Sequence, residues 1–317
     1  MDVSVIVVNY NTRDLLLQTL RSVKDASQSV SVEVFVVDNG SDDGSPEAVA
    51  VQFPEVHLIV NQYNVGFAAA NNQAIQQARG RYYLLLNSDT VVRNDTLKIM
   101  VDFMDGSSSV GASGCKVVLA DGCLDLACRR SFPTVLSSLY HVLKLDKLFP
   151  NSKRFAAYNL TYLNPDASYP VDCLVGAFMM VRSRVVDEVG LLDERFFMYG
   201  EDIDWCYRIR QHGWDIWYVP ATSITHYKGA SGKKSMKVLY HFYWSLYLYA
   251  HKHRFPNMSV FVRNVIKIGI FVILAMAVIK FGAKRLIDYA YDLLGVSKHS
   301  QIKEAGGTTD TVQGPPL

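Results

Sequence analysis

Two aspartates stand directly after apolar runs that are typical of buried β-strands. Asp38 ends VEVFVVD (32–38), and Asp89 follows YYLLLNS (82–88). In a parallel sheet both side chains would lie at the carboxyl edge, where such sheets bind ligands. Asp38 could accept hydrogen bonds from a base or a ribose, and Asp89 could bind a hard divalent cation that bridges two phosphates. Either aspartate taken alone is explained as well by a turn or a helix cap.

The elements that must position these residues alternate along the first third of the chain. Strand-like runs begin near residues 3, 32, 56 and 82, with helical patterns of about ten residues between them. This alternation indicates βαβ units, and it predicts an α/β fold with a mostly parallel, Rossmann-like sheet.

The turn after the first strand decides against two classes of nucleotide-binding protein. A dinucleotide-binding oxidoreductase needs a turn of the form G-x-G-x-x-G, which lets the backbone approach a pyrophosphate. Here the turn reads NYNTRD (9–14), and the Walker pattern of phosphate-binding loops is also missing from the chain. Both classes are therefore disfavoured.

The middle of the chain has a weaker pattern. Residues 106–170 contain DGSSSVGASG and the apolar run TVLSSLYHVLKLDKLFP (134–150), and we expect a loop-rich lobe with one amphipathic helix. Beyond it, VDCLVGAFMMVR (171–182) and WDIWYVP (214–220) predict strands, the second ended by its proline. EDIDWCYRIRQHG (201–213) predicts a helix that ends at glycine.

Seven segments follow one another in a specific order. They are SVIVVNYN, VVDNGSDDGS, NVGFAAANN, LLLNSDTVV, VGAFMMVRS, LLDERFFMYGEDIDWCYRIRQHGW and ITHYKGASGKK. Together they resemble the family 2 glycosyltransferases with the A-type fold, and within them the bacterial rhamnosyltransferase-like branch. The resemblance implies an inverting, metal-dependent sugar transfer. It also implies a catalytic domain over residues 1–235, with a nucleotide-sugar-binding half (1–105) and an acceptor half (106–235).

The resemblance assigns donor-binding roles to individual residues. Asp38 would read the nucleotide base. Gly176 and Ala177 belong to a small-residue segment, where large side chains would block the sugar. The other donor-binding residues that the resemblance implies are Asn9, Tyr10, Asn11, Asn64, Gly66, Asn87 and Ser88.

The segment Asn87-Ser88-Asp89 takes the place of the family's Asp-x-Asp metal motif. An amide is a weaker ligand than a carboxylate, so Asp89 would be the principal protein ligand of Mg²⁺ or Mn²⁺. His226 takes the place of a later metal ligand, and an imidazole suits Mn²⁺ better than Mg²⁺. A structural histidine is the alternative. KGASGKK (228–234) suits a lid that closes over a diphosphate, or an ordinary solvated loop.

The acids of EDIDW (201–205) open a predicted helix. An inverting transfer needs a carboxylate to take the proton of the acceptor hydroxyl, and Asp202 matches the second acid of the family's Glu-Asp pair. Capping alone also explains acids at a helix N-terminus. Glu201, Trp205 and Arg208 would support the acceptor site, although helix packing explains Trp205 equally well.

Charge is distributed unevenly. The chain has a net charge of +2, but Lys228–Arg285 holds eleven Lys and Arg and no Asp or Glu. Aromatic and apolar runs lie among these cations, which suits an anionic membrane surface. We predict membrane-associating helices over residues 236–297 and a disordered tail over 298–317. Nothing else in the chain resembles a nucleic-acid-binding module.

The apolar run Ile268–Ile279 has 12 residues, against roughly 20 for a spanning helix, so an in-plane or re-entrant helix is favoured over a span, with a buried core helix as the alternative. The five cysteines include no CxxC pair, which indicates reduced, cytosolic thiols. These features predict a peripheral or monotopic protein at the cytoplasmic face of the cell membrane.

The sequence thus predicts a transferase of cell-surface polysaccharide synthesis. The preferred reaction moves L-rhamnose from dTDP-rhamnose to a saccharide acceptor on a polyprenyl carrier, and the choice of sugar depends on the family likeness. One alternative is the same fold with UDP-hexose, UDP-GlcNAc or UDP-galactofuranose as donor. Another is a non-catalytic nucleotide-sugar-binding protein, which would have lost its base or metal residues, whereas Asp89, Asp202 and His226 are all present.

Overall fold

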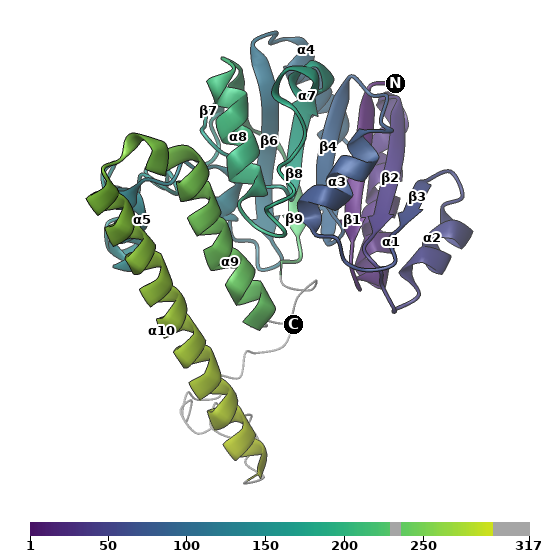
Figure 1. Cartoon of the computed structure of the whole chain (residues 1–317). Helices are drawn as coiled ribbons and strands as arrows, with labels where there is room; N and C mark the ends of the chain where they lie inside the picture. The colour runs from purple at the N-terminus through teal and green to yellow at the C-terminus, as the bar shows by residue number, and fades with distance from the viewer. Residues whose placement is uncertain (229–235, 294–317) are drawn as a thin grey trace, which may run out of the picture.

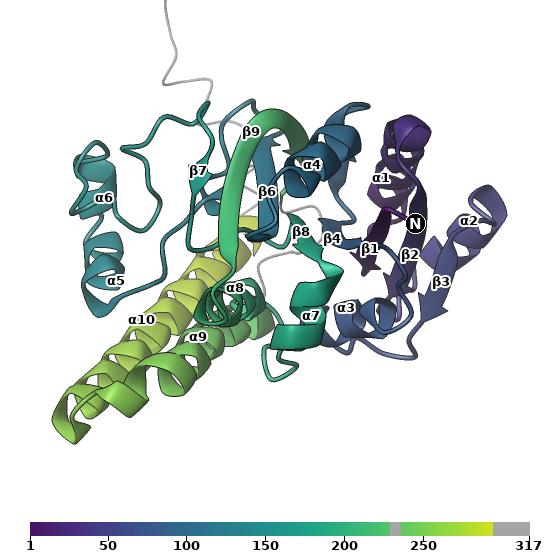
Figure 2. The same ribbon diagram turned by 90° about the horizontal axis from the view of Figure 1, so that it is seen from above.

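The computed structural model describes residues 1–228 and 236–293. It is a twisted sheet with helices on both faces, and a pair of long helices lies at one end of it (Figures 1 and 2). The strands follow the order β3-β2-β1-β4-β8-β6-β9-β5, with β7 paired to β9. The predicted lid beyond Lys228 and the predicted tail lie outside the described residues.

The first half is built from βαβ units, as the alternation of the sequence predicts. Its elements are β1 (Val3–Asn9), α1 (Arg13–Ala26), β2 (Val32–Asp38), α2 (Ser45–Gln52), β3 (His57–Val60), α3 (Phe67–Ile75) and β4 (Tyr82–Asn87). All pairings among these four strands are parallel. Asn9 pairs with Asp38, and Val8 pairs with Asn87, so the polar residues that follow the strands meet at one carboxyl edge.

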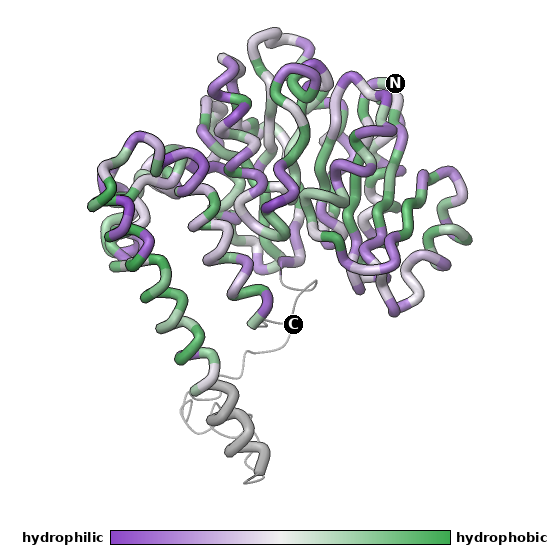
Figure 3. The backbone as a smooth tube through the Cα atoms, viewed as in Figure 1, coloured by the Kyte–Doolittle hydropathy of each residue, from purple (hydrophilic) through white to green (hydrophobic). Residues whose placement is uncertain are grey.

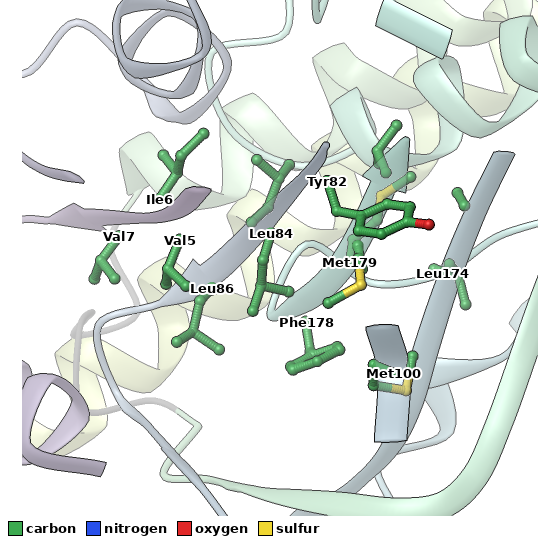
Figure 4. Packing of buried hydrophobic residues seen from close by; sticks show 14 of the residues in the cluster. Val5, Ile6, Val7, Tyr82, Leu84, Leu86, Met100, Leu174, Phe178 and Met179 are labelled. Carbon is green, nitrogen blue, oxygen red and sulfur yellow. The ribbon is translucent and has the colours of Figure 1, made fainter. Parts of the chain in front are cut away.

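The core of this half consists of aliphatic side chains from β1 and β4. Val5, Ile6 and Val7 are fully buried, as are Leu84 and, within 1% of its surface, Leu86 (Figure 4). Adjacent residues of a strand point to opposite faces, so burial of every residue in a run means that helices cover both sides. The sheet is therefore a rigid support for the polar edge.

The second half completes the sheet with mixed pairing. Its elements are β5 (Thr90–Val92), α4 (Thr96–Asp105), β6 (Val110–Leu119), η2 (Leu126–Cys128), α5 (Val135–Val142), α6 (Leu145–Leu148), β7 (Tyr169–Pro170), β8 (Phe178–Arg182), α7 (Ser183–Val189), α8 (Glu201–Gln211) and β9 (Asp215–His226). The strand β8 is antiparallel to both β4 and β6, whereas β6 and β9 are parallel. A loop-rich lobe, not a single crossover helix, joins β6 to β8, so their pairing need not be parallel.

Two expectations for this half are wrong. The glycine- and serine-rich stretch near residue 110 is not loop but the start of β6, because its glycines allow close packing: a Cβ on Gly111 would come within 2.7 Å of Trp214. The strand at Trp214 also does not end at Pro220. β9 continues to His226 across a register shift, since proline cannot donate to the ladder and is accommodated at a bulge.

The basic, aromatic region forms helices, as predicted. They are α9 (Met236–Tyr249), a π-helix η3 (Ala250–Arg254), a 3₁₀ turn η4 (Phe255–Asn257) and α10 (Val260–Leu293). Figure 3 shows hydrophobic residues along the part of α10 that leads away from the sheet.

One stretch of α10, Val260–Ala283, is long and apolar enough to cross a membrane, and none of it is buried. Its 24 residues give a length of about 36 Å, against roughly 30 Å of hydrocarbon in a bilayer. The stretch is longer than the uninterrupted apolar run 268–279, because the helix continues past the two lysines, Lys267 and Lys280, that flank that run. The alternative of a buried core helix is wrong for this stretch.

Candidate active site

The carboxylate of Asp38 is the centre of a hydrogen-bonded cluster at the end of β1 and β2. Its Oδ1 accepts from Asn9 Nδ2 at 2.8 Å and from Ser41 Oγ at 2.7 Å, and its Oδ2 accepts from the Ser41 backbone N–H at 2.8 Å. Asn11 adopts a φ of 54° and accepts a hydrogen bond from the backbone of Asp42. Oδ2 of Asp38 therefore keeps one acceptor lone pair, while Tyr10 is exposed at the rim.

Thr12 connects this cluster to the predicted metal motif. Its hydroxyl donates to Asn9 Oδ1 at 2.7 Å and lies 2.8 Å from the hydroxyl of Ser88. An open hollow of about 340 Å³ lies beside it, lined by Asn11, Thr12, Arg13, Asp14, Leu15 and Asp43. The residues expected to bind the base and the residues of the Asn-Ser-Asp segment thus lie in one continuous site.

The loop before α3 packs against the loop that leads to the predicted base. The backbone N–H of Gly66 donates to Asn64 Oδ1 at 2.9 Å, and Gly66 adopts a φ of +95°. A Cβ at this position would lie 2.7 Å from the carbonyl oxygen of Phe197, so only glycine fits. Gly176 lies against the ring of Phe67, where a Cβ would meet it at 3.1 Å.

The small-residue segment continues into the metal motif. Ala177 is buried, and its carbonyl accepts from the backbone N–H of Asn87 at 3.2 Å. The predicted donor residues of both halves are therefore brought to the same edge.

Asp89 and His226 lie in contact, as the resemblance implies for two ligands of one metal. Strand pairing places Thr90 opposite His226, and the backbone N–H of Tyr227 donates to the Asp89 carbonyl. His226 Nε2 lies 3.1 Å from Asp89 Oδ1 and 3.3 Å from Asn87 Nδ2. Both charged side chains are almost fully buried.

A third carboxylate, Asp125, lies behind His226. Its Oδ2 is 3.6 Å from His226 Nδ1, and Lys228 Nζ approaches its Oδ1 at 3.1 Å. Burial lowers the pKa of His226, but Asp125 and Asp89 outweigh it and raise the pKa to about 9. Burial raises the pKa of Asp125, but His226 and Lys228 bring it far below its ordinary value.

The donor atoms around His226 fit a partial cation site. Among residues 1–228 and 236–293, no group of three or more His, Cys, Asp and Glu is arranged to hold a metal ion by itself. Asp89 offers one carboxylate, and His226 would offer one imidazole once a bound metal displaced its proton, a set that suits Mn²⁺ when phosphate oxygens supply the remaining ligands. These two residues could therefore supply only part of a coordination shell.

Asp202 begins α8 and forms a buried ion pair. Its Oδ2 accepts from Arg130 Nη2 at 2.7 Å, and its Oδ1 accepts from the Ile203 backbone N–H at 2.8 Å. Arg130 also donates to the carbonyl of Leu174 at 2.6 Å. Burial lowers the pKa of Arg130, but the charge of Asp202 outweighs it and raises the pKa above its ordinary value. The carboxylate is thus held in one orientation.

Glu201 lies beside Asp202 in a different environment. It is buried, and its Oε2 has no hydrogen-bond partner among the described residues. Burial and the neighbouring charge of Asp202 raise the pKa of Glu201 to about 8. Glu201 is therefore neutral at pH 7.

The segment from Asp125 to Arg130 joins the two acidic centres. Asp125 contacts His226 and Arg130 contacts Asp202, and the short turn η2 lies between them. Five residues can span at most about 18 Å, which sets an upper limit on the distance between the Cα atoms of Asp125 and Arg130. Sequence reasoning missed both Asp125 and Arg130.

Trp205 and Arg208, which are expected to support the acceptor site, bond to the protein itself in this structure. Trp205 is fully buried, and its indole N–H donates to the Gly190 carbonyl at 3.0 Å. Arg208 donates to Asp204 Oδ2 at 2.9 Å and to the carbonyls of Val189 and Leu191. Both side chains hold α8 against the preceding loop, because α8 turns this face toward the core.

The A-type fold that the resemblance implies is confirmed by solved structures. The chain superposes on the mannosyltransferase PcManGT from Pyrobaculum calidifontis, solved with GDP-Man and Mn²⁺, with a TM-score of 0.52 at 20% identity. The superposition covers 79% of this chain and 63% of that one, so this chain spans just under two thirds of its length.

Sequence comparison then defines the family. Residues 1–240 match a family model described as glycosyltransferase like family 2. The chain belongs to this family and is a glycosyltransferase.

Two of the relatives are named as rhamnosyltransferases. An N-acetylglucosaminyl-diphospho-decaprenol L-rhamnosyltransferase of Mycobacterium tuberculosis (strain H37Rv) is 29% identical over 238 residues, which cover 72% of this chain and 76% of that protein. Rhamnosyltransferase WbbL of Escherichia coli (strain K12) is 28% identical over 172 residues, which cover 51% of this chain and 61% of WbbL. The chain is thus similar to rhamnosyltransferases within its family.

Proposed function

We propose that this glycosyltransferase moves a sugar from a nucleoside diphosphate to a lipid-linked saccharide, with inversion at the anomeric carbon and Asp202 as the base. The observation that carries the proposal is that one short segment of the chain contacts both of the acidic groups of residues needed for the transfer. Asp89 and His226 form one centre, Asp202 forms the other, and Asp125–Arg130 contacts both.

The donor nucleotide would lie along the polar carboxyl edge. The free lone pair of Asp38 Oδ2 accepts a hydrogen bond from the base, and the exposed ring of Tyr10 covers the base from the solvent side. Gly66 and Gly176 allow close packing against Phe197 and Phe67. The carbonyl of Ala177 accepts from the Asn87 backbone N–H at this edge.

Asp89 and His226 are the residues that would hold a divalent cation. When bound, this cation neutralises the charge that develops on the leaving diphosphate. Asp125 lies 3.6 Å from Nδ1 of the imidazole ring, and this ion-pair contact would favour the orientation in which Nε2 faces Asp89, as a carboxylate behind a ligating histidine does. Lys228 lies against Asp125 and adds positive charge at the same edge.

Asp202 would accept the proton of the acceptor hydroxyl as that oxygen attacks the sugar. Arg130 and the Ile203 N–H each occupy one lone pair of the carboxylate, so lone pairs remain for the incoming proton. Glu201, neutral at pH 7, would not compete as a base and would donate a hydrogen bond to the acceptor.

The two similar rhamnosyltransferases favour L-rhamnose, carried by dTDP, as the donor sugar, and the M. tuberculosis name favours a polyprenyl diphosphate acceptor. A UDP-sugar donor is the alternative. The exposed apolar stretch of α10 and the cations around it support a site of action at the membrane surface.

The test is an assay of nucleoside diphosphate release. Purified protein is incubated with dTDP-rhamnose, UDP-GlcNAc, UDP-galactose or UDP-galactofuranose, with Mg²⁺ or Mn²⁺ and with chelator, while lipid-linked acceptors are added. Release is expected only with donor, acceptor and cation together. Asp202→Asn should abolish release and leave donor binding intact, and the exposed Asp121→Asn serves as the control. Full turnover by Asp202→Asn, or release unchanged by chelator, would contradict the assigned roles.

A further inference from the structure

The helix α5 turns an apolar stripe toward solvent. Val135, Leu136, Leu139 and Leu143 are each between 49% and 58% exposed. At about 100° per residue these four positions fall within one arc of roughly 100°, so they form a single face. The opposite face carries Ser137 and Tyr140, which are buried. A soluble helix normally buries its apolar stripe, and α5 does the reverse.

The stripe continues into the next turn. Leu148 and Phe149 are 68% and 46% exposed, which extends the apolar surface through α6. The helix itself is well defined, because Thr134 and Ser137 form a reciprocal capping box at its N-terminus. The apolar exposure is therefore a property of an ordered surface.

The exposed Lys, Arg, Asp and Glu residues of the segment 133–154 are all cationic. They are Lys144, Lys147, Lys153 and Arg154. The single acid of residues 133–154 is Asp146, which is buried and bonded to His141 Nδ1 at 2.7 Å. A segment with exposed apolar side chains, exposed cations and no exposed carboxylate complements an anionic lipid headgroup layer.

The surface lies near both α10 and the catalytic base. Figures 1 and 2 place α5 and the α9–α10 pair at the same end of the molecule, and Arg254 Nη2 donates to the Pro133 carbonyl at 3.0 Å. Arg130, the partner of Asp202, precedes Val135 by five residues.

We propose that residues 135–149 form a second membrane-contact surface, which lays the exposed stripe of α5 into the headgroup region of an anionic bilayer. With α10 as the other contact, two separate attachments fix how the molecule sits on the membrane and turn the side that carries Asp202 toward the lipids. That orienting role rests on the proposed function, but the contact itself does not depend on any sugar transfer.

The test places a reporter on the stripe. Of the five cysteines only Cys123 is exposed, so Cys123→Ser leaves no exposed native thiol. Leu139→Cys in this background carries an environment-sensitive fluorophore, and Val51→Cys, at a site 81% exposed in α2, is the matched control. Both full-length proteins are mixed with vesicles of phosphatidylcholine and phosphatidylglycerol in equal parts.

The label at position 139 is expected to shift to shorter wavelength and to be quenched by lipids with brominated acyl chains, while the label at position 51 does neither. If the protein floats with vesicles but the label at 139 stays in water, α10 alone binds and the proposal fails. Absence of vesicle binding also refutes it. The emission of the label at position 139 is also recorded in buffer without vesicles. If it shifts to shorter wavelength as the protein concentration rises, a second copy of the protein covers the stripe, and the proposal is overturned.

Charge and apolar contributions are separated with two variants. The double variant Lys144→Ser with Lys147→Ser should bind anionic vesicles more weakly, by roughly fivefold for each lysine removed, and should bind phosphatidylcholine vesicles as the wild type does. Leu136→Glu with Leu139→Glu alters only exposed positions, so the fold is retained while insertion of the stripe is lost. Transfer to a water-soluble acceptor is measured in parallel, so a failed membrane contact is distinguished from a failed enzymatic assignment.

Discussion

The ion pair between Arg130 and Asp202 gives the sharpest prediction. The two groups are 2.7 Å apart, and their side chains are only 10% and 11% exposed. Arg130→Met removes the cation and leaves Asp202 as an unpaired charge in a largely dry environment. Breaking such a pair costs about 3–5 kcal/mol, which is in line with a Coulomb energy of about 4 kcal/mol for charges 4 Å apart at an effective dielectric of about 20. The midpoint of thermal unfolding should fall by roughly 10 °C.

The assay is thermal unfolding of the full chain in mild detergent, for the single variants and for Arg130→Met combined with Asp202→Asn. The double variant should recover most of the lost stability, because the unpaired charge is gone. Arg184→Met, which breaks a pair that is 74% and 35% exposed, is the control and should cost less than about 1 kcal/mol. Additive effects of the two single variants, or an Arg130→Met cost as small as that of the control, would refute the reasoning.

Three further predictions concern single residues. Asp125→Asn should weaken Mn²⁺ binding about 10–100-fold in calorimetric titrations with nucleoside diphosphate, because it loosens the imidazole of His226, and Asp121→Asn should not. Glu201 has a pKa of about 8 in the native state against an ordinary 4.5, so between pH 4.5 and pH 8 the native state holds a proton that the unfolded state has lost. The protonated carboxyl therefore stabilises the fold fully below pH 4.5, and this stabilisation is lost as the pH rises through 8. Relative to Glu201→Gln, the wild type should therefore lose on the order of 4 kcal/mol between pH 4 and pH 9 in denaturant titrations, and parallel profiles would contradict this. Gly66→Ala should raise the KM for donor and cost about 1–3 kcal/mol, more than Gly122→Ala, where the positive φ is similar but nothing lies within 4 Å of the new Cβ.

The sequence predicts the residues whose position follows from local periodicity. Asp38, Asn87 and Asp89 stand at strand ends, and Asp202 stands at a helix start, so their places at one edge follow from the alternation of elements. The structure brings Asp38, Asn87 and Asp89 to one edge with His226, as expected. Asp202 is connected to this edge through the segment 125–130. Their assigned roles in donor binding and catalysis stay predictions until the assays above are done.

Asp125 and Arg130 could not be found in this way. Each lies in an irregular segment with no period, and Arg130 meets its partner 72 residues further along the chain. The need to pair a buried charge becomes visible only when the fold brings both groups out of water. A double arginine within a largely apolar, irregular stretch is the one available signal, since arginine is rarely buried unless paired.

The start of β6 and the packing of Trp205 could not be predicted for a related reason. Glycine weakens a strand in isolation, but at Gly111 tight packing against Trp214 outweighs that preference. Trp205 stands one turn beyond Asp202, and spacing alone does not tell which face of α8 meets the core. Burial, which depends on the whole fold, decides both cases.

The carboxylate of Asp204 has a consequence for any shortened version of the protein. It is completely buried two residues after Asp202, and it contacts Arg208 from its own helix and Lys252 and His253 from η3. A polypeptide cut at residue 235 would lose Lys252 and His253 while the negative charge stayed enclosed. Residues 1–235 therefore depend on the helical region that follows them, because η3 supplies Lys252 and His253 as partners of a buried carboxylate in the helix that carries Asp202.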